Sequence, residues 1–478
     1  MTRPSALRLQ HATDRAVALT ILERCRAQHR FVQDVVDQVL DLYPLQAEGK
    51  RLATHLAYGV LRRKKTLDAL LARCVERPRH RVEPWLWNAL RIGVYQLGFL
   101  SRIPAYAAIH ETVGIAQDLG KPRAKGFINA VLRRALTLLG ATPLGWAEEW
   151  GAATLPVPPE AVPEGHTPPT LAHGVALRLL AQPVFPDPDK EHLAYMASAF
   201  SLPRWLLERW SQRMEPSKLT SVVCWSIVSP PVWLRVNSLR TRREDVLDRL
   251  QQAGIEVYPG DHPQSVRLAS HHPIRTLPGY EAGWFAVQDL SAMYVASALD
   301  PRPGWRVLDL CAAPGGKTTH LAELMGNEGL IVACDRDPKR LHKVQQLAQR
   351  LGISIVQTHL LAQDQDPPSG PFDGALVDAP CTNTGVLARR PEVRYRLQPH
   401  DLQELVPVQT KLLIQAAERL EPRGVLVYST CSIEPEENEM VVDNVLAALP
   451  WLRLEWQRHF DPGMPADGGY VARLQRIQ

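Results

Sequence analysis

The 478-residue sequence contains no long uninterrupted run of apolar residues. A helix needs about 20 consecutive, mostly apolar residues to span a bilayer, so we expect no membrane-spanning segment and no membrane partner. The first residues, Met1 to Ser5, also lack the apolar stretch and small-residue cleavage site of a secretory signal. We therefore expect the protein to be cytoplasmic.

Cysteine is scarce as well, with seven residues and no C-x-x-C pair. An odd number of scattered cysteines predicts neither a disulfide framework nor a zinc site, and we expect no bound metal. A free cysteine is usually a small buried apolar residue. This interpretation is expected to hold for Cys25, Cys74, Cys224 and Cys334.

Two nucleotide-binding patterns are also missing. The pattern G-x-G-x-x-G, typical of dinucleotide-binding folds, does not occur. Gly315 to Thr318 resemble the end of a phosphate-binding P-loop, but Cys311 stands where that motif requires its first glycine. These absences argue against a phosphate cradle and against a nicotinamide or flavin cofactor.

The charge that is present is unevenly distributed. Residues 1–140 contain 23 Lys and Arg against 11 Asp and Glu, a net charge of +12 in a chain whose total is +5. A single basic cluster is more often a solvated helix surface, but such clusters recur throughout this block. Their repetition favours a polyanionic partner, and nucleic acid is the partner that we expect.

Residue patterns divide the chain into four parts. Residues 1–140 show apolar residues at helical spacing and no strand-like alternation, which predicts an all-α domain. Ten of the forty prolines fall between Pro143 and Pro188, so residues 141–190 are expected to form an extended, partly flexible linker without helix or sheet. Residues 191–285 mix short helices and strands, which predicts a small α+β module.

Residues 286–478 alternate strands with helices, which predicts a doubly wound α/β domain of the Rossmann-like kind. The fold class is therefore multidomain: all-α, then a small α+β module, then α/β. The expected strands lie at 307–310, 330–335, 353–356, 375–378 and 425–429, with 471–474 as a candidate final strand.

Three segments follow the ends of these strands. A glycine-containing turn, Cys311 to Lys317, follows the first strand, while Cys381 follows the strand at 375–378 and Cys431 the strand at 425–429. Ligands of open α/β folds bind at the carboxyl ends of the strands. Both thiols and the turn are therefore expected to lie at one crevice.

Two thiols at such a crevice suit the methylation of cytosine. Carbon 5 of this base is a poor nucleophile until a thiolate adds to carbon 6. Asp378, three residues before Cys381, is placed to hydrogen-bond the N3 edge of a base. Asp335 ends the second strand, where a carboxylate can accept both ribose hydroxyls of a nucleoside. S-adenosylmethionine (SAM), which has a ribose and no phosphate, fits this pattern.

Three motifs, at residues 308–319, 378–385 and 428–438, together resemble the NOL1/NOP2/Sun family of RNA cytosine-5 methyltransferases. In that family the thiol of the T-C-S segment attacks the base, which implies that Cys431 is the nucleophile. The thiol of the P-C segment assists product release, which implies that role for Cys381. Related DNA enzymes use the P-C cysteine as nucleophile, so the reverse assignment stays open.

The same resemblance implies the residues that bind the cofactor. Asp335 would bind the ribose of SAM, and Asp378 is expected to touch both base and cofactor. The methionine end is expected to lie against Cys311, Ala312, Ala313, Pro314, Gly315, Gly316 and Lys317.

The resemblance extends upstream. Residues 58–63, 107–111 and 126–134 resemble the NusB-type RNA-binding domain, and residues 201–205 and 235–237 resemble the module that precedes the catalytic domain. This order is that of the bacterial Sun/Fmu enzymes. It implies a methyltransferase that acts on carbon 5 of a specific cytosine in 16S rRNA, similar to the enzymes that methylate cytosine 967, while the exact target cytosine stays open. We expect the protein to be a monomer.

Some points stay open at this level. The family commonly has a Gly-Asp pair after the third strand that contacts adenine; this chain has Thr358-His359, and either His359 or Asp364 could replace the contact. A tRNA cytosine-5 methyltransferase would share the catalytic motifs. A non-catalytic RNA-binding factor is a third interpretation, but such a factor would need neither thiol.

Overall fold

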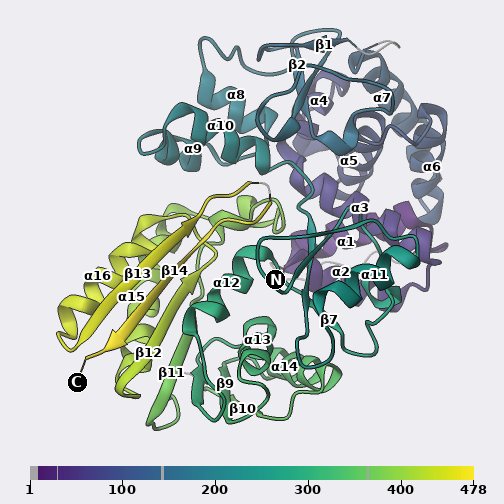
Figure 1. The fold of residues 1–478 in the computed structure, drawn as a ribbon. Coiled ribbons are helices and arrows are strands. Elements are labelled where there is room, and N and C mark those ends of the chain that lie inside the picture. Colours follow the sequence, from purple (N-terminus) through teal and green to yellow (C-terminus); the bar gives the residue numbers. More distant parts are fainter. Residues whose placement is uncertain (1–8, 29–30, 141–144, 363–364, 464, 478) are drawn as a thin grey trace. The chain divides into compact units, whose positions relative to one another are not determined.

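The structure is a computed structural model that describes residues 9–28, 31–140, 145–362, 365–463 and 465–477 (Figure 1). The chain divides into two compact units. Unit 1 comprises Met1–Ser229 and Leu387–Arg396, and unit 2 comprises Pro230–Val386 and Leu397–Gln478. None of the helices in the described ranges is long and apolar enough to cross a membrane.

The described residues of 9–140 in unit 1 form seven α-helices, which confirms the prediction of an all-α N-terminal domain. Their apolar residues recur at helical spacing, and the central helix α5 is buried on nearly every side. The helices are α1 (Asp14–Gln28), α2 (Val32–Leu42), α3 (Ala47–Arg62), α4 (Lys64–Cys74), α5 (Pro84–Phe99), α6 (Ala105–Asp118) and α7 (Lys125–Leu138).

The proline-rich stretch contains a three-stranded antiparallel sheet, so the prediction that it lacks sheet is wrong. Its strands are β1 (Trp146–Ala147), β2 (Thr154–Val157) and β3 (Ala176–Leu179), in the order β1-β3-β2. Pro156 lies inside β2 and pairs with Leu177. An edge strand tolerates proline because one side of it needs no ladder hydrogen bond. Pro143 lies outside the described residues.

Three further helices complete the sequence-continuous part of unit 1. They are α8 (His192–Ala199), α9 (Arg204–Ser211) and α10 (Pro216–Trp225). Helix α9 is one of the short helices expected in residues 191–285. All three belong to unit 1, whereas the sequence pattern grouped residues 191–285 together.

Leu387–Arg396 also pack in unit 1, although in sequence they lie between the motifs at 378–385 and 428–438. The buried guanidinium of Arg394 donates hydrogen bonds to the carbonyl oxygens of Arg62 and Ser226, at 3.0 and 2.8 Å. In turn, the Arg62 guanidinium donates to the carbonyl oxygen of Ala388 at 2.9 Å. The segment is thus fixed by arginines that bind backbone carbonyls, an arrangement that no sequence pattern predicted.

Unit 2 opens with the predicted α+β module. Its strands are β4 (Val232–Val236), β5 (Val257–Pro259), β6 (Ser265–Leu268) and β7 (Phe285–Val287), in an antiparallel sheet of order β5-β6-β4-β7. Helix α11 (Arg243–Gln252) covers this sheet, and Val246 and Leu250 of the helix share a core with Leu234 and Phe285.

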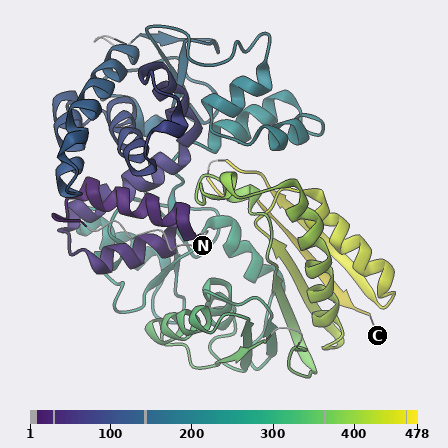
Figure 2. The ribbon, with the colours of Figure 1, turned by 180° about the vertical axis from the view of Figure 1, so that it is seen from behind.

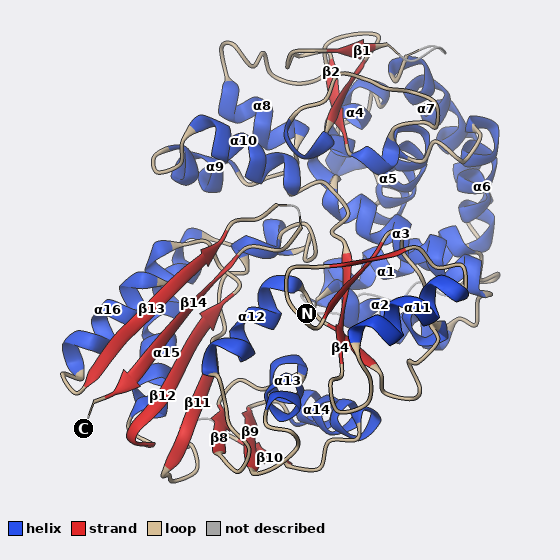
Figure 3. Ribbon diagram, in the orientation of Figure 1, coloured by secondary structure: helices blue, strands red, loops and turns tan. Residues whose placement is uncertain are grey.

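A seven-stranded sheet forms the rest of unit 2 and confirms the doubly wound α/β prediction (Figure 3). Its order is β10-β9-β8-β11-β12-β14-β13; the first five strands run parallel, and β14 and β13 are antiparallel to their neighbours. The strands are β8 (Arg306–Asp309), β9 (Leu330–Asp335), β10 (Val356–Leu360), β11 (Phe372–Asp378), β12 (Leu420–Thr430), β13 (Leu452–Phe460) and β14 (Gly469–Arg476).

The two edges of this sheet differ from the prediction. Strand β10 begins at Val356, where the predicted strand 353–356 ends, and Ile353 and Ile355 precede it and pack against the core. Strand β13 was not predicted at all. Most of its residues are exposed, so an edge strand of this kind carries little apolar pattern. The candidate final strand at 471–474 is confirmed by β14.

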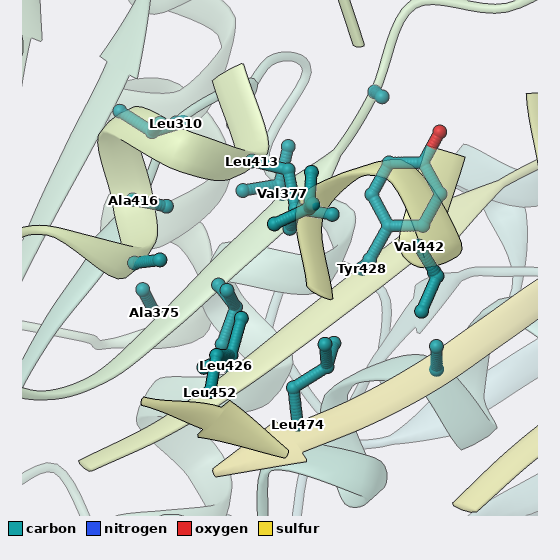
Figure 4. Packing of buried hydrophobic residues seen from close by; sticks show 14 of the residues in the cluster. Leu310, Ala375, Val377, Leu413, Ala416, Leu426, Tyr428, Val442, Leu452 and Leu474 are labelled. Carbon is teal, nitrogen blue, oxygen red and sulfur yellow. The ribbon is translucent and has the colours of Figure 1, made fainter. Parts of the chain in front are cut away.

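Helices cover both faces of the sheet (Figures 1 and 2). Leu426 and Tyr428 pack with α15 and α16 on one face (Figure 4), and Val425 and Val427 pack with helices on the other face. Burial on both faces explains why the parallel strands are continuous apolar runs. The helices are α12 (Leu290–Leu299), α13 (Gly316–Leu324), α14 (Pro338–Leu351), α15 (Pro399–Ala417) and α16 (Glu439–Ala448).

Candidate active site

The sequence-predicted residues meet at the carboxyl edge of the parallel strands in unit 2. Strand β11 lies between β8 and β12, so the ends of these three strands are neighbours. Asp378 at the end of β11 is in register with Ser429 of β12. The chain order reverses at the β8–β11 pair, and ligands of doubly wound folds bind at such a point.

The two thiols lie side by side. Sγ of Cys381 is 3.3 Å from Sγ of Cys431, and both residues are half-buried. The hydrogen bond to Cys431, together with burial, raises the pKa of the Cys381 thiol well above its usual value. Either thiol can donate this hydrogen bond, and the raised pKa of Cys381 favours its protonated form.

The loop after Cys381 also contacts the second cysteine. Sγ of Cys431 lies 3.2 Å from Oδ1 of Asn383, and the Gly385 amide donates to the carbonyl oxygen of Cys431 at 3.0 Å. Asn383 has a positive φ of 60°, a conformation that asparagine adopts more readily than most residues. The loop and the end of β12 are thus fastened together around the two sulfur atoms.

Lys317 and Asp378 form an ion pair beside the thiols. Nζ of Lys317 donates to Oδ2 of Asp378 at 2.6 Å, and the Ser429 hydroxyl donates to Oδ1 at 2.8 Å. Burial lowers the pKa of Lys317, but the charge of Asp378 and the bond to it outweigh burial, so the net pKa is raised. Lys317 is therefore a cation at neutral pH, and Asp378 has two donors that fix its orientation.

A buried carboxylate braces the cysteine loop from behind. Glu437 accepts hydrogen bonds from both the amide and the hydroxyl of Thr382 and from Nε2 of Gln409. Its own carbonyl oxygen accepts from the Tyr428 hydroxyl at 2.6 Å. Since Thr382 adjoins Cys381, these bonds determine where the first thiol lies.

The turn Cys311 to Lys317 connects β8 to α13. Gly315 has φ of 107°, and a Cβ there would lie 3.1 Å from Cα of Val344, so a side chain would be strained and crowded. The Gly315 amide donates to the carbonyl oxygen of Ala312 at 2.8 Å. Burial raises the pKa of the Cys311 thiol, which makes it a poor nucleophile.

Asp335 ends β9 as predicted and is almost completely buried. Its two carboxylate oxygens accept from the amides of Ala313 and Asp337, at 3.3 and 3.0 Å. Arg340 lies 3.5 Å from one of them. The carboxylate therefore links the glycine turn to the start of α14.

A second buried carboxylate, Asp309, ends β8 and was not singled out from the sequence. Its Oδ2 accepts from the Thr318 hydroxyl at 2.7 Å. Burial raises the pKa of Asp309 to about 7, with further increases from the neighbouring charges of Asp378 and Asp335. This side chain therefore fastens the first turn of α13.

Of the two candidates for the adenine contact, only His359 lies within the described residues. His359 is an exposed residue of β10, in register with Cys334 of β9. Asp364 lies outside the described residues. Among the described residues, no group of three histidine, cysteine or acidic side chains could hold a metal ion.

A cavity lies beside the ends of β11 and β12. Cys431, Lys317 and Asp378 line it, and Cys381 is not among its lining residues. The further lining residues include Asp289, Ser291, Phe460, Asp467 and Tyr470. Cys431 thus lines the cavity, and the thiol of Cys381 lies 3.3 Å from its sulfur.

Two relatives align with this chain over about nine-tenths of its length. The probable ribosomal RNA small subunit methyltransferase B of Synechocystis sp. is 34% identical over 90% of this chain and 88% of its own length. The ribosomal RNA small subunit methyltransferase B of Klebsiella pneumoniae is 33% identical over 91% of this chain and 90% of its own. The chain belongs to the RsmB/F family of 16S rRNA methyltransferases.

Family models match the parts of this RsmB/F chain in the same order. The NusB family matches residues 12–137, the ferredoxin-like domain of RsmF/B-like methyltransferases matches 202–275, and the 16S rRNA methyltransferase RsmB/F model matches 296–469. The fold is shared with the crystal structure of PH0851, which has a TM-score of 0.74 and 24% identity over 98% of this chain and 100% of that chain.

Glu437, Asn383 and Asp309 are among the site residues of this RsmB/F protein for which the sequence predicted no role. All three lie inside the motifs at 308–319, 378–385 and 428–438, and that position was the only signal available. Their partners are set by tertiary contacts; Gln409, for example, reaches Glu437 from α15. A motif therefore shows where such residues lie but not what they bind.

Proposed function

We propose that this protein transfers the methyl group of SAM to carbon 5 of a cytosine in 16S rRNA, at position 967, through a covalent bond between Cys431 and carbon 6 of the base. The observation that carries the proposal is the position of Cys431. Its sulfur lines the cavity together with Lys317 and Asp378, and it lies 3.3 Å from the thiol of Cys381.

Cys431 is assigned as the nucleophile because it lines the cavity, whereas Cys381 does not. Addition of the Cys431 thiolate to carbon 6 makes carbon 5 nucleophilic, and carbon 5 then takes the methyl group that SAM supplies. Loss of the proton on carbon 5 and breakage of the carbon–sulfur bond restore the ring. The Lys317 cation favours the thiolate form.

Cys381 is assigned to product release. Its raised pKa keeps it protonated, so it is unsuited to attack the base. A thiol that donates a hydrogen bond to Cys431 stabilises the departing sulfur as a thiolate. Asp378 is assigned to orient the base, because Lys317 and Ser429 fix its carboxylate beside the cavity.

The residues at the ends of β8, β9 and β11 fit SAM. Gly315 has a φ of 107° and packs closely against Val344, so glycine lets the turn from Cys311 to Lys317 take the conformation that is proposed to bind SAM. Asp335 is proposed to accept the ribose hydroxyls, and Asp378 to contact the cofactor as well as the base. His359 remains a candidate for the adenine contact, since it lies on the neighbouring strand.

The helical domain is proposed to supply the sequence-independent affinity for 16S rRNA in the cytoplasm. Residues 1–140 carry a net charge of +12, and neutralising phosphates with such charges makes binding weaken as salt rises. We also propose that the protein acts as a monomer. The parts proposed from the sequence are 1–140, 141–190, 191–285 and 286–478; of these, 141–190 contains a sheet, and residues 191–229 pack in unit 1. The target base must leave its stack to enter the cavity.

The proposal is tested by transfer from tritiated SAM to 16S rRNA that lacks modifications, with unmodified tRNA as the comparison and bisulfite sequencing to locate 5-methylcytosine. We expect label in 16S rRNA and 5-methylcytosine at position 967. Label in tRNA alone would show that tRNA, and not 16S rRNA, is the substrate. Label at another atom or base would refute cytosine-5 methylation. Binding of RNA without transfer to either would favour a non-catalytic factor.

A further inference from the structure

A buried arginine in the α+β module contacts α13, the helix that follows the turn Cys311 to Lys317. Arg235 lies on β4, and its side chain and that of Glu323 on α13 are completely buried. Nε and Nη2 of Arg235 donate to the two carboxylate oxygens of Glu323 at 3.0 and 2.7 Å. The remaining donors bind Oγ1 of Thr319, the carbonyl oxygen of Gly316 and Oε1 of Gln288. All five N–H groups of the guanidinium therefore have acceptors.

A second residue from the module reinforces the same contact. Nε2 of Gln264 donates to Glu323 at 3.0 Å and to the carbonyl oxygen of Val236 at 2.8 Å. Oε1 of Gln264 lies 2.9 Å from Nε2 of His320, the residue after Thr319. The module thus binds the first two turns of α13 at several points, and Arg235 is the residue that joins most of them.

This contact bears on the proposed SAM site because α13 begins within the turn Cys311 to Lys317. Gly316 is the first residue of α13 and directly precedes Lys317, whose Nζ reaches Asp378 at 2.6 Å. Thr318 in the same turn donates to Asp309. A guanidinium that fixes the Gly316 carbonyl therefore fixes the peptide between the glycine turn and Lys317.

Stability alone does not explain a buried ion pair of this kind. Removing two charges from water costs as much as their attraction returns, and well-packed apolar residues often replace such pairs without loss. A planar guanidinium with five directed donors does hold its acceptors in one geometry, which lysine cannot do. The arrangement is suited to positioning a backbone segment.

We propose that Arg235 is a positioning residue for SAM, which holds the Gly316 carbonyl and so keeps the turn Cys311 to Lys317 in its binding conformation. The inference rests on the proposed function only in taking this turn as the SAM site. It makes the α+β module part of the cofactor site, although the module contributes no residue to the cavity lining.

The test compares Arg235→Lys with a matched control, Arg350→Lys. Arg350 on α14 also joins the α/β domain to the module, through hydrogen bonds from Nη1 to the carbonyl oxygens of Tyr280 and Phe285 at 2.8 and 3.0 Å. The dissociation constant for SAM is measured by titration calorimetry without RNA, and amide hydrogen exchange is followed over residues 316–320. We expect about tenfold weaker binding and faster exchange in Arg235→Lys, and neither change in Arg350→Lys.

Wild-type affinity and exchange in Arg235→Lys would overturn the proposal, and so would equal losses in both variants. If Arg235→Lys does not fold, the double variant Arg235→Met/Glu323→Met removes both buried charges, and unchanged SAM affinity in it would also be contradictory. In turnover, the KM for SAM should rise while the KM for RNA stays constant. A wild-type protein that binds SAM but methylates no cytosine would refute the proposed function and leave this inference standing.

Discussion

The two sides of the candidate active site are built differently. On the side of β11 and β12, neutral hydrogen bonds surround the sulfur atoms, and one buried carboxylate, Glu437, braces the loop. On the side of β8 and β9, the carboxylates of Asp309 and Asp335 gather near the glycine turn. We call these the thiol side and the cofactor side.

The difference follows from what each side has to do in the proposed reaction. A nucleophile that forms a bond must be held close to the reacting atom, and a misplacement of 1 Å costs about a hundredfold in rate. Several short bonds from rigid elements achieve this on the thiol side. The cofactor side has to exchange hydrogen bonds with a ligand that comes and goes, and carboxylates supply strong acceptors for hydroxyl groups.

The largest effect is expected from Cys431→Ser, which breaks the thiol side. A serine hydroxyl is far less acidic and less nucleophilic than a thiol, so we expect kcat to fall by about 10⁴-fold or more. SAM affinity should stay within twofold, because the cofactor side is untouched. Methyl transfer and calorimetry measure the two quantities, with Cys74→Ala in unit 1 as the control. Strong transfer by Cys431→Ser would show that the two sides are not divided in this way.

Cys381→Ala should separate the two thiols. We expect steady-state turnover to fall by about a hundredfold, the size of a lost proton-transfer or leaving-group contact, while a single round of attack still occurs. Quench-flow kinetics would show a burst of RNA covalently attached to the protein, followed by its slow release. A variant with no burst and no bound RNA would place Cys381 in the attack step instead.

Asp335→Asn breaks the cofactor side. Loss of a charged acceptor costs about 1.5–3 kcal/mol, so the KM for SAM should rise by about 10- to 100-fold with kcat little changed. Asp337→Asn is the matched control, because asparagine caps α14 as well as aspartate does. A fall in kcat at saturating SAM would contradict the assignment of Asp335 to cofactor binding.

Glu437→Gln tests the brace of the thiol side. The amide that it introduces is a donor facing the donors of Thr382 and Gln409, so we expect the free energy of unfolding to fall by about 1–3 kcal/mol. Urea denaturation measures this change. Glu418→Gln, at an exposed position after α15, should change it by less than about 0.5 kcal/mol. Equal free energies of unfolding for the two variants would show that Glu437 does not stabilise the cysteine loop.

The smallest effect concerns pH and the cofactor side. The pKa of Asp309 is raised in the folded state from 3.8 to about 7, so its contribution to stability is full below pH 4 and is lost as pH rises to about 7. Asp309→Asn cannot ionise and should remove this slope. Urea denaturation at pH 5 and pH 8 should show the variant stabilised at pH 8, by on the order of 1 kcal/mol. Identical pH profiles would contradict the raised pKa.

The central part of the site was predictable because it depends on strand ends. Cys381, Asp378 and Cys431 each follow a buried apolar strand, and parallel strands in one sheet necessarily end at one edge. The structure brings these residues together as expected. The motifs also gave the correct family, since the relatives share nearly the whole chain.

Other features could not be predicted because their partners are remote or their patterns are weak. Arg235 binds Glu323, 88 positions away, and no local pattern announces such a pair. Strand β13 is exposed at a sheet edge, where hydrophobic alternation is not required. The prolines of residues 141–190 argued against a strand there, although the edge strand β2 accommodates Pro156.

The central claim is that Cys431 bonds to the target base, and peptide mapping tests it most directly. Cys381→Ala is incubated with SAM and unmodified 16S rRNA, denatured, digested with nuclease and trypsin, and analysed by mass spectrometry. We predict a nucleotide attached to the peptide that contains Cys431. An adduct on the Cys381 peptide of Cys431→Ala, or methylation without any cysteine adduct, would contradict the account.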